Sequence, residues 1–179
     1  MIYEPREDSF LMEKAVKKYA CGKVLDMGTG SGIQAIAAAK NKKVRSIIAV
    51  DINKEAVIIA LHDAMKRGIP LSVQQSNLFD NIDEKFDTII FNPPYLPSDP
   101  KLKDLTLDGG KKGYELIQKF LKQAKKYLEK NGIILLLFSS LTDKAKVDEI
   151  LTKNKYKFKK VDKLNLDFEE LYIYKIKCK

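Results

Sequence analysis

Short apolar runs alternate with longer amphipathic segments along most of the chain. The apolar runs have the length of strands, and the segments between them repeat apolar positions at helical spacing. This alternation indicates a mostly parallel sheet covered on both faces by helices. We expect strands at residues 23–27, 46–50, 71–75, 86–91 and 133–138, helices at 33–40, 53–67, 112–129 and 142–153, and two final strands at 156–164 and 171–177.

Local signals predict where several of these elements begin and end. Asn53 is a residue type that caps helix N-termini, and Gly68 and Pro70 stop the helix that follows it. Asn131-Gly132 is expected to close the helix at 112–129, and the unbroken apolar run after it is typical of a strand buried on both faces. The last two strands are expected to pair as an antiparallel hairpin at one edge. The predicted fold is therefore α/β and Rossmann-like, with a mostly parallel seven-stranded sheet.

The length and composition narrow the class of protein. The 179 residues suit one domain spanning residues 1–179. No apolar run approaches the roughly 18 residues of a membrane span, and the N-terminus is charged where a secretory signal is apolar, so we expect a cytoplasmic protein. Cys21, Cys178 and the single histidine, His62, form no pattern for zinc or for a disulfide framework. We therefore expect free thiols, a histidine on a helix surface and no metal site.

The net charge of +9 is unevenly distributed. Residues 1–110 hold 15 basic and 15 acidic side chains, whereas residues 111–179 hold 18 basic and 9 acidic ones. A basic surface of this kind can bind RNA or a ribosome-bound factor, and it can equally be a solvated lysine-rich face. Only Arg6, Arg45 and Arg67 are arginines, although recognition of phosphates and bases favours arginine. Nucleic acid is thus a possible partner of the C-terminal part.

A glycine-rich turn follows the first expected strand. Gly28, Gly30 and Gly32 alternate there, and glycine lets the chain turn sharply and lets a ligand approach the backbone. Asp26 precedes the glycines and Asp51 ends the next strand, so both carboxylates are expected at the sheet edge where open α/β sheets bind ligands. Each aspartate alone is also compatible with a turn or a helix cap. Together they indicate a nucleoside cofactor, with Asp51 on the ribose hydroxyls and Asp26 near the amino-acid end.

The fourth expected strand runs directly into Asn92-Pro93-Pro94-Tyr95, here called the NPPY turn. Two successive prolines fix φ at about −65° and remove two donors, which makes the turn stiff. An amide or aromatic amine is a poor nucleophile because its nitrogen lone pair is delocalised. If the Asn92 side-chain oxygen and the Pro93 carbonyl each accept one N–H of an NH₂ group, that nitrogen is oriented for methyl transfer, and Tyr95 can stack on the planar group. The turn predicts N-methylation without choosing among glutamine amide, adenine amine and guanine amine.

These motifs resemble the class I methyltransferases of the HemK group, whose members methylate the glutamine amide in the GGQ motif of translation release factors. The resemblance covers most of the chain. The opening segment, residues 3–11 (Tyr3-Glu4-Pro5-Arg6-Glu7-Asp8-Ser9-Phe10-Leu11), is similar to the start of the short archaeal and eukaryotic branch, in which it lies over the cofactor. Asn77-Leu78-Phe79 is similar to the family's Asp-Leu-Phe, with Asn where Asp is usual, and the change retains an acceptor for the adenine amine.

The resemblance implies S-adenosylmethionine as cofactor, a release factor as substrate, and a small zinc-ribbon activator that pairs with an edge strand. Residues 71–75 are the candidate docking strand. Asp108-Gly109-Gly110 matches a family position near the substrate, although Leu107 stands where an aromatic residue is usual. The expected cofactor-binding residues are Glu7, Asp8, Ser9, Asp26, Gly28, Thr29, Gly30, Gly32, Asp51, Ile52, Asn77, Leu78 and Asn92. The expected substrate-binding residues are Asn92, Pro93, Pro94, Tyr95, Gly109 and Gly110, of which Asn92, Pro93 and Tyr95 are expected to be catalytic.

Three functions compete at this point. Release-factor glutamine methylation is favoured by the resemblance. Methylation of an adenine or guanine amine in RNA or DNA is favoured by the basic C-terminal part, but enzymes that flip a base usually use extra surface for the flanking strand. A non-enzymatic, cofactor-binding stabiliser of another subunit is disfavoured because the NPPY turn is intact.

Overall fold

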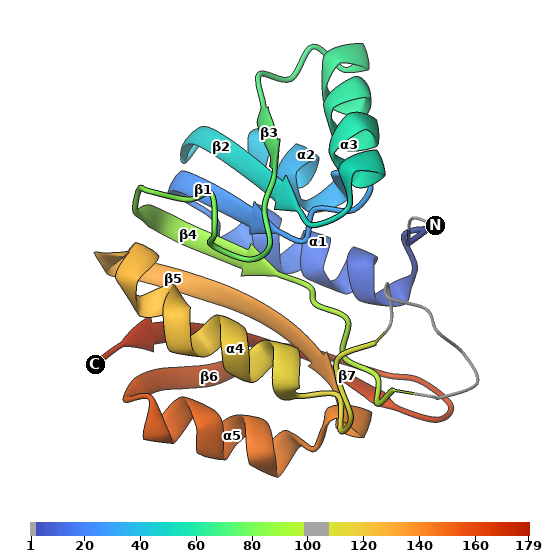
Figure 1. Ribbon diagram of the computed structural model, residues 1–179, viewed down its shortest axis with the longest axis vertical. Coiled ribbons are helices and arrows are strands. Elements are labelled where there is room, and N and C mark those ends of the chain that lie inside the picture. Colours follow the sequence, from blue (N-terminus) through green and yellow to red (C-terminus); the bar gives the residue numbers. More distant parts are fainter. Residues whose placement is uncertain (1–2, 99–107) are drawn as a thin grey trace.

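The computed structural model describes residues 3–98 and 108–179, and its centre is a seven-stranded sheet (Figure 1). The strand order is β3-β2-β1-β4-β5-β7-β6. Strands β1 to β5 run parallel to one another, whereas β7 is antiparallel to both β5 and β6. The strands are β1 (Gly22–Met27), β2 (Val44–Asp51), β3 (Ser72–Gln75), β4 (Phe86–Phe91), β5 (Leu128–Ser139), β6 (Tyr156–Asn165) and β7 (Glu170–Cys178). The predicted mostly parallel sheet and its antiparallel edge hairpin are confirmed.

Helices cover both faces of this sheet (Figure 1). They are α1 (Glu7–Tyr19), α2 (Ile33–Ala39), α3 (Lys54–Lys66), α4 (Glu115–Ala124) and α5 (Lys144–Lys153), with short 3-10 turns η1 (Lys125–Tyr127) and η2 (Ser140–Thr142). Apolar residues of α1 and α2 pack on one face, and those of α4 and α5 pack on the other. The α3 helix lies against β2 and β3. Among the described residues no helix is both long and apolar enough to cross a membrane.

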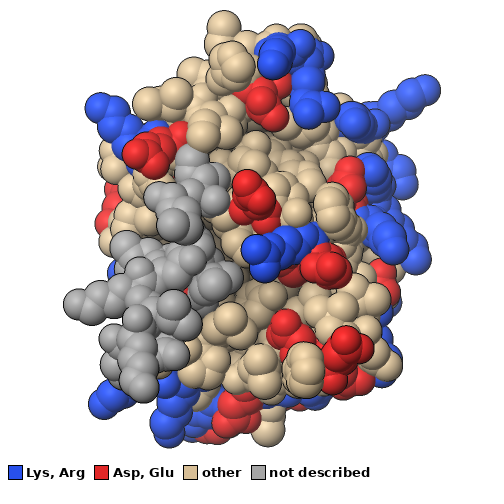
Figure 2. Space-filling view, turned by 90° about the vertical axis from the view of Figure 1, so that its right-hand side faces the viewer, with Lys and Arg blue, Asp and Glu red and all other residues tan. Residues whose placement is uncertain are grey.

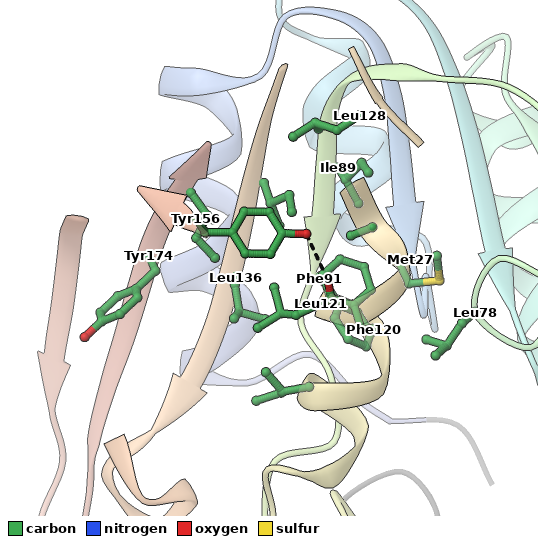
Figure 3. Close-up of a cluster of buried hydrophobic side chains, with 14 of the residues drawn as sticks. Met27, Leu78, Ile89, Phe91, Phe120, Leu121, Leu128, Leu136, Tyr156 and Tyr174 are labelled. Atoms are coloured by element: carbon green, nitrogen blue, oxygen red, sulfur yellow. Dashed lines mark hydrogen bonds between the residues drawn. The ribbon is translucent and has the colours of Figure 1, made fainter. Parts of the chain in front are cut away.

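Strand β5 is buried on both faces, as its unbroken apolar sequence predicts. Alternate side chains enter the two cores: Ile134, Leu136 and Phe138 pack with α4 and α5, while Leu135 and Leu137 pack with α1 and α2. The core on the α4 and α5 side also holds the buried Tyr156, whose hydroxyl donates a hydrogen bond of 2.9 Å to the Leu121 carbonyl (Figure 3).

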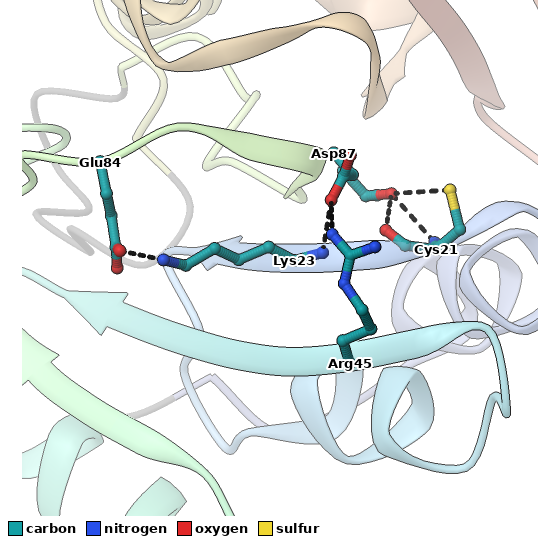
Figure 4. Close-up of polar contacts among 6 residues, drawn as sticks. Cys21, Lys23, Arg45, Glu84 and Asp87 are labelled. Carbon is teal, nitrogen blue, oxygen red and sulfur yellow. Dashed lines mark hydrogen bonds and ion pairs between the residues drawn. The ribbon is translucent and has the colours of Figure 1, made fainter.

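Polar contacts join three strands at the amino ends of the parallel part of the sheet. Asp87 Oδ2 accepts hydrogen bonds from the Lys23 backbone N–H at 2.8 Å and from Arg45 Nη2 at 2.9 Å, and Lys23 also pairs with Glu84 (Figure 4). A Cβ at Gly22 would collide with Asp87. These contacts connect β1, β2 and β4 at the end opposite to the glycine-rich turn, which leaves the carboxyl ends available for a ligand.

One prediction about the middle of the chain was wrong, and a helix near its start was not predicted. The helix expected at 112–129 ends at Ala124, and Asn131-Gly132 does not close it but lies inside β5. Leu128 already pairs with Phe86, and the register then shifts, so the polar residues 129–132 interrupt the ladder without ending the strand. Helix α1 was not expected, although its buried Leu11, Met12, Ala15 and Val16 have helical spacing.

Candidate active site

The carboxyl ends of β1, β2 and β4 point to one face of the molecule, and the glycine-rich turn lies there (Figure 1). Gly28, Gly30 and Gly32 have φ values of 66°, 54° and 82°, which residues with a Cβ rarely adopt. A Cβ at Gly30 would meet no atom within 4 Å, whereas one at Gly32 would press on Ala60 of α3. The loop therefore needs glycine for its conformation, and it leaves open space beside Gly30 for a ligand to approach.

Asp26 is buried beneath the glycine-rich loop and stabilises it through hydrogen bonds. Its Oδ2 accepts hydrogen bonds from Thr29 Oγ1 at 2.7 Å and from the Ala35 backbone N–H at 3.0 Å, at the start of α2. Burial raises the pKa of Asp26 from its usual 3.8 to about 7, although the two hydrogen bonds act in the opposite direction. The Thr29 side chain is buried and turned toward Asp26. The structure thus gives Asp26 a structural task, and Asp26 Oδ1 and the Thr29 backbone are what remain for a cofactor.

Asp51 lies at the end of β2, beside the glycine-rich loop. Its Oδ2 accepts a hydrogen bond from the Gly30 backbone N–H at 2.9 Å, and its Oδ1 accepts one from the Asn53 backbone N–H at 2.9 Å. Asp51 does not cap α3, because the Asn53 side chain does so by accepting from the Glu55 N–H. Each carboxylate oxygen can accept a second hydrogen bond. Asp51 can therefore bind a diol while it holds the loop.

The remaining expected adenosine contacts lie around the ends of β2 and β3. The Ser76 backbone N–H donates to the Asp51 carbonyl at 2.9 Å, which brings Asn77 next to Asp51. The side chain of Asn77 is exposed, Ile52 is 65% exposed, and Leu78 is buried with a φ of 51°. These residues form one wall beside the glycine-rich loop.

The NPPY turn follows β4 at the same sheet edge. Asn92 Nδ2 donates a hydrogen bond of 2.8 Å to Asp8 Oδ2 of α1. The other polar atom, Asn92 Oδ1, is buried and has no hydrogen-bond partner among the described residues. Unpaired buried oxygens are rare because desolvation without a partner is costly, so such an atom is expected to pair with a water, an ion or a bound ligand. Asn92 thus presents a free acceptor at the site.

Neighbouring segments fix the backbone of the NPPY turn. Thr142 Oγ1 donates to the Tyr95 carbonyl at 2.9 Å. A Cβ at Gly109 would lie 2.8 Å from the Pro94 carbonyl oxygen, and one at Gly113 would lie 2.5 Å from that of Tyr95. Gly109 is therefore required for the close approach of two backbones. Gly110 lies next to it with a φ of 107° and accepts from the Ser98 N–H through its carbonyl. Leu107 lies outside the described residues.

Tyr95 is half-buried between the two cores. Burial, together with the negative charges of Asp8 and Glu169, raises its pKa far above the usual value of 10. The phenol is therefore neutral throughout the physiological range, and its hydroxyl is a donor rather than a base.

Helix α1 brings part of the opening segment into the site. Asp8 and Ser9 are buried, whereas Glu7 is exposed. Burial and the neighbouring Asp8 raise the pKa of Tyr3 well above its usual value, and the Tyr3 hydroxyl donates to Asp8 Oδ1 at 2.9 Å. The structure thus joins Asp8 and Ser9 to the NPPY turn and to α2, and it leaves Glu7 outside this contact network.

Two further unpaired side-chain oxygens were not predicted from the sequence. Gln34 Oε1 and Glu169 Oε2 are, like Asn92 Oδ1, buried without a hydrogen-bond partner in the described part of the chain. Gln34 follows the glycine-rich loop in α2, and Glu169 lies in the connection between β6 and β7. A polar residue in the apolar helix at 33–40 was the available signal for Gln34, whereas nothing local distinguishes Glu169. The described residues contain no group of three or more His, Cys, Asp or Glu side chains that could hold a metal ion.

A doubly wound sheet that carries a glycine-rich loop, a strand-end aspartate and the NPPY turn at one edge has the arrangement expected of a class I methyltransferase, with its ligand site at the strand ends. The profile of the methyltransferase small domain matches residues 7–165, and the chain belongs to this family. Within the family, the resemblance to HemK-type glutamine methyltransferases is confirmed by the relatives that the chain matches. The chain is therefore an S-adenosylmethionine-dependent N-methyltransferase.

A protein of Methanocaldococcus jannaschii with the provisional name protein N5-glutamine methyltransferase is 38% identical over 177 residues, which cover 96% of this chain and 89% of that protein. The release factor glutamine methyltransferase of Lactococcus lactis is 37% identical over 124 residues, 64% of this chain and 46% of that protein. The match therefore spans less than half of the bacterial relative.

Among solved structures, the E. cuniculi Mtq2–Trm112 complex, described as responsible for methylation of the eRF1 termination factor, contains a chain similar to this one. Its TM-score is 0.79 at 24% identity, and the match covers 99% of both chains. A ribosomal protein L11 methylase from Lactobacillus delbrueckii has a TM-score of 0.76 at 23% identity, covering 100% of this chain and 82% of that one. At these identities the two structures support the fold and leave the substrate open.

Proposed function

We propose that this enzyme methylates the side-chain amide nitrogen of a glutamine in a translation release factor, with S-adenosylmethionine as methyl donor. The observation that carries the proposal is the buried, unpaired oxygen of Asn92 at the carboxyl edge of the sheet. An acceptor held in this way recognises an N–H donor, and a primary amide offers two. The names of the relatives agree with a glutamine amide as the source of that donor.

The residues at the sheet edge fit the proposed cofactor. Asp51 has free lone pairs for the two ribose hydroxyls, the open space beside Gly30 admits the ligand, and Asn77 offers an amide to the adenine edge. We assign the cofactor to these residues, to Gly28, Gly32, Ile52 and Leu78 around them, and to the glycine-rich loop in general. When bound, S-adenosylmethionine supplies a methyl group on a positively charged sulfur.

Asn92 and Pro93 prepare the nucleophile in this proposal. The Asn92 oxygen and the Pro93 carbonyl each accept one N–H of the amide, which orients the nitrogen lone pair and localises part of its density. Transfer of the methyl group to this nitrogen would leave the cofactor as a neutral thioether, and the amide would release one proton to solvent. The neutral Tyr95 ring covers the planar amide, and Gly109 and Gly110 keep the NPPY turn in place.

The face around the site suits a protein substrate. Among the described residues, Figure 2 shows mainly acidic and uncharged side chains in the middle of this face together with a basic side chain, whereas most Lys and Arg lie along its margins. A nucleic-acid enzyme needs basic side chains where the phosphates run. Two exposed apolar side chains belong to segments beside the NPPY turn, since Thr142 binds the Tyr95 carbonyl and the charge of Glu169 acts on Tyr95. Leu141 is 48% exposed and precedes Thr142, which binds Tyr95, and Phe168 is 92% exposed in the connection between β6 and β7.

We also propose that a small activator subunit docks on α3 and the edge strand β3. Ile58, Leu61 and Met65 are exposed by 58%, 39% and 70% and share one face of α3, opposite the buried alanines. Exposed apolar stripes of this kind mark interaction sites. β3 is an edge strand of the described sheet, so a partner strand can pair with it. The Mtq2 structure, which contains Trm112, is the precedent.

A competition experiment, in which protein and RNA substrates compete for a labelled methyl group, tests the proposed substrate. The enzyme, alone and with a zinc-ribbon activator, is incubated with methyl-labelled S-adenosylmethionine, an archaeal-type release factor, tRNA and rRNA in one reaction. We expect label in the release factor, and a release factor whose GGQ glutamine is replaced should remain unlabelled. Label that enters only RNA would exclude the proposal and would favour methylation of a base amine.

A further inference from the structure

Asp8 occupies an unexpected environment for an acid in the first turn of a helix. Acids at that position usually stay in solvent and interact with the helix dipole or the free backbone N–H groups. Asp8 is only 4% exposed, and the hydrogen bonds to its carboxylate come from the side chains of Tyr3, Ser9 and Asn92, at 2.9, 3.4 and 2.8 Å. Helix stability therefore does not account for this carboxylate.

The carboxylate restricts Asn92 to one orientation. An ionised carboxylate accepts hydrogen bonds and donates none, so the Asn92 amide must turn its NH₂ group toward Asp8. The reverse orientation would place two oxygens against each other and would leave the NH₂ group unpaired. Because Nδ2 faces Asp8 at 2.8 Å, Oδ1 faces away from it, and this is the buried oxygen without a partner.

Asp8 itself is held from two sides. The Tyr3 hydroxyl donates to its Oδ1, and Gln34 Nε2 donates to the carbonyl of the adjacent Ser9 at 2.9 Å. Gln34 belongs to α2, the helix that begins at the glycine-rich loop. The start of α1 is thus fixed to the cofactor loop on one side and to the NPPY turn on the other.

We propose that Asp8 is a positioning residue that holds the Asn92 oxygen toward the nitrogen to be methylated. The inference rests on the proposed function, because it is the substrate amide that gives the Asn92 oxygen its task. It also replaces direct contact with the cofactor as the main role of Asp8. Asp8 acts through Asn92 and touches neither reactant.

Two substitutions and a matched control test this role. In Asp8→Ala, Asn92 loses its partner and its amide can rotate, so kcat toward the release factor should fall about 100-fold, the size expected for a misplaced catalytic group. In Asp8→Asn, the new amide oxygen still accepts from Asn92 but no longer enforces one orientation, so kcat should lie between those of Asp8→Ala and the native enzyme. Cofactor affinity should be unchanged in both. Glu13→Gln, a change farther along α1 at a residue paired with Lys17, should leave all values unchanged.

A measurement without substrate separates this inference from the proposed function. In ¹⁵N-labelled protein the hydrogen-bonded Asn92 Nδ2–H should exchange slowly with solvent, and it should exchange rapidly in Asp8→Ala but not in Glu13→Gln. Unchanged exchange, or native kcat in the Asp8 variants, would overturn the positioning role. So would weaker cofactor binding with full kcat at saturation. A native enzyme that does not methylate the release factor would overturn the proposed function, whatever the exchange rates show.

Discussion

Replacing Asp26 by Asn should remove a large pH dependence from the stability of the fold. Burial raises the pKa of Asp26 from 3.8 to about 7, so between these two pH values the folded state binds a proton that the unfolded state has released. The free energy of unfolding must therefore fall as pH rises through this window. A rise of roughly three pH units corresponds to about 4 kcal/mol, at about 1.4 kcal/mol per unit. The contribution of Asp26 to the free energy of unfolding is fully present below pH 3.8 and is lost as the pH rises to about 7.

Asp26→Asn isolates this effect from the other titrating groups. The amide oxygen can accept the same bonds from Thr29 and Ala35 that the neutral acid accepts, so the two proteins should be equally stable near pH 4. At pH 8 the variant should be more stable by up to about 4 kcal/mol, because it carries no buried charge. Urea unfolding followed by circular dichroism from pH 4 to 8 measures the difference. A difference that does not vary with pH would refute the reasoning, and a variant that is less stable at pH 8 would mean that Asp26 is ionised in a favourable environment.

Three further predictions follow from single contacts. Asp51→Ala should weaken S-adenosylmethionine binding by about 1–3 kcal/mol in calorimetry, since a charge-assisted hydrogen bond is lost; unchanged affinity would contradict the ribose assignment. Tyr156→Phe removes the buried hydrogen bond to the Leu121 carbonyl and should lower the free energy of unfolding by about 1 kcal/mol, and equal stability by urea unfolding would show that the hydrogen bond contributes nothing. Met65→Lys should leave the melting temperature unchanged and prevent copurification of the activator, and an intact complex would place docking elsewhere.

The order of elements was predictable because this fold produces strong local patterns. Buried parallel strands such as β4 and β5 are continuous apolar runs, and Asn53 caps α3 as its residue type predicts. The start of α1 was hidden because its pattern is inverted there: Asp8 and Ser9 are buried, whereas Phe10 is 51% exposed. A residue chosen for a contact in the site breaks the hydrophobic periodicity that reveals a helix.

The sequence was sufficient to predict which residues meet at the sheet edge, but not which of them contact one another. The positions of the glycines, Asp51 and the NPPY turn follow from strand ends, since these meet at one sheet edge. The hydrogen bond between Asp8 and Asn92 joins residues 84 positions apart, and no local pattern specifies such a pair. The same holds for the unpaired oxygens of Gln34 and Glu169, because burial depends on what the whole chain places around them.

The most direct test of the central claim is to locate the methyl group by mass spectrometry of the release factor after turnover. We predict one methyl group on the side-chain nitrogen of the GGQ glutamine with the native enzyme. With Asn92→Ala, the rate should fall about 10²- to 10³-fold, the size expected when one preorganised group is removed, while S-adenosylmethionine still binds. A methyl group on another residue, or an undiminished rate with Asn92→Ala, would contradict the account.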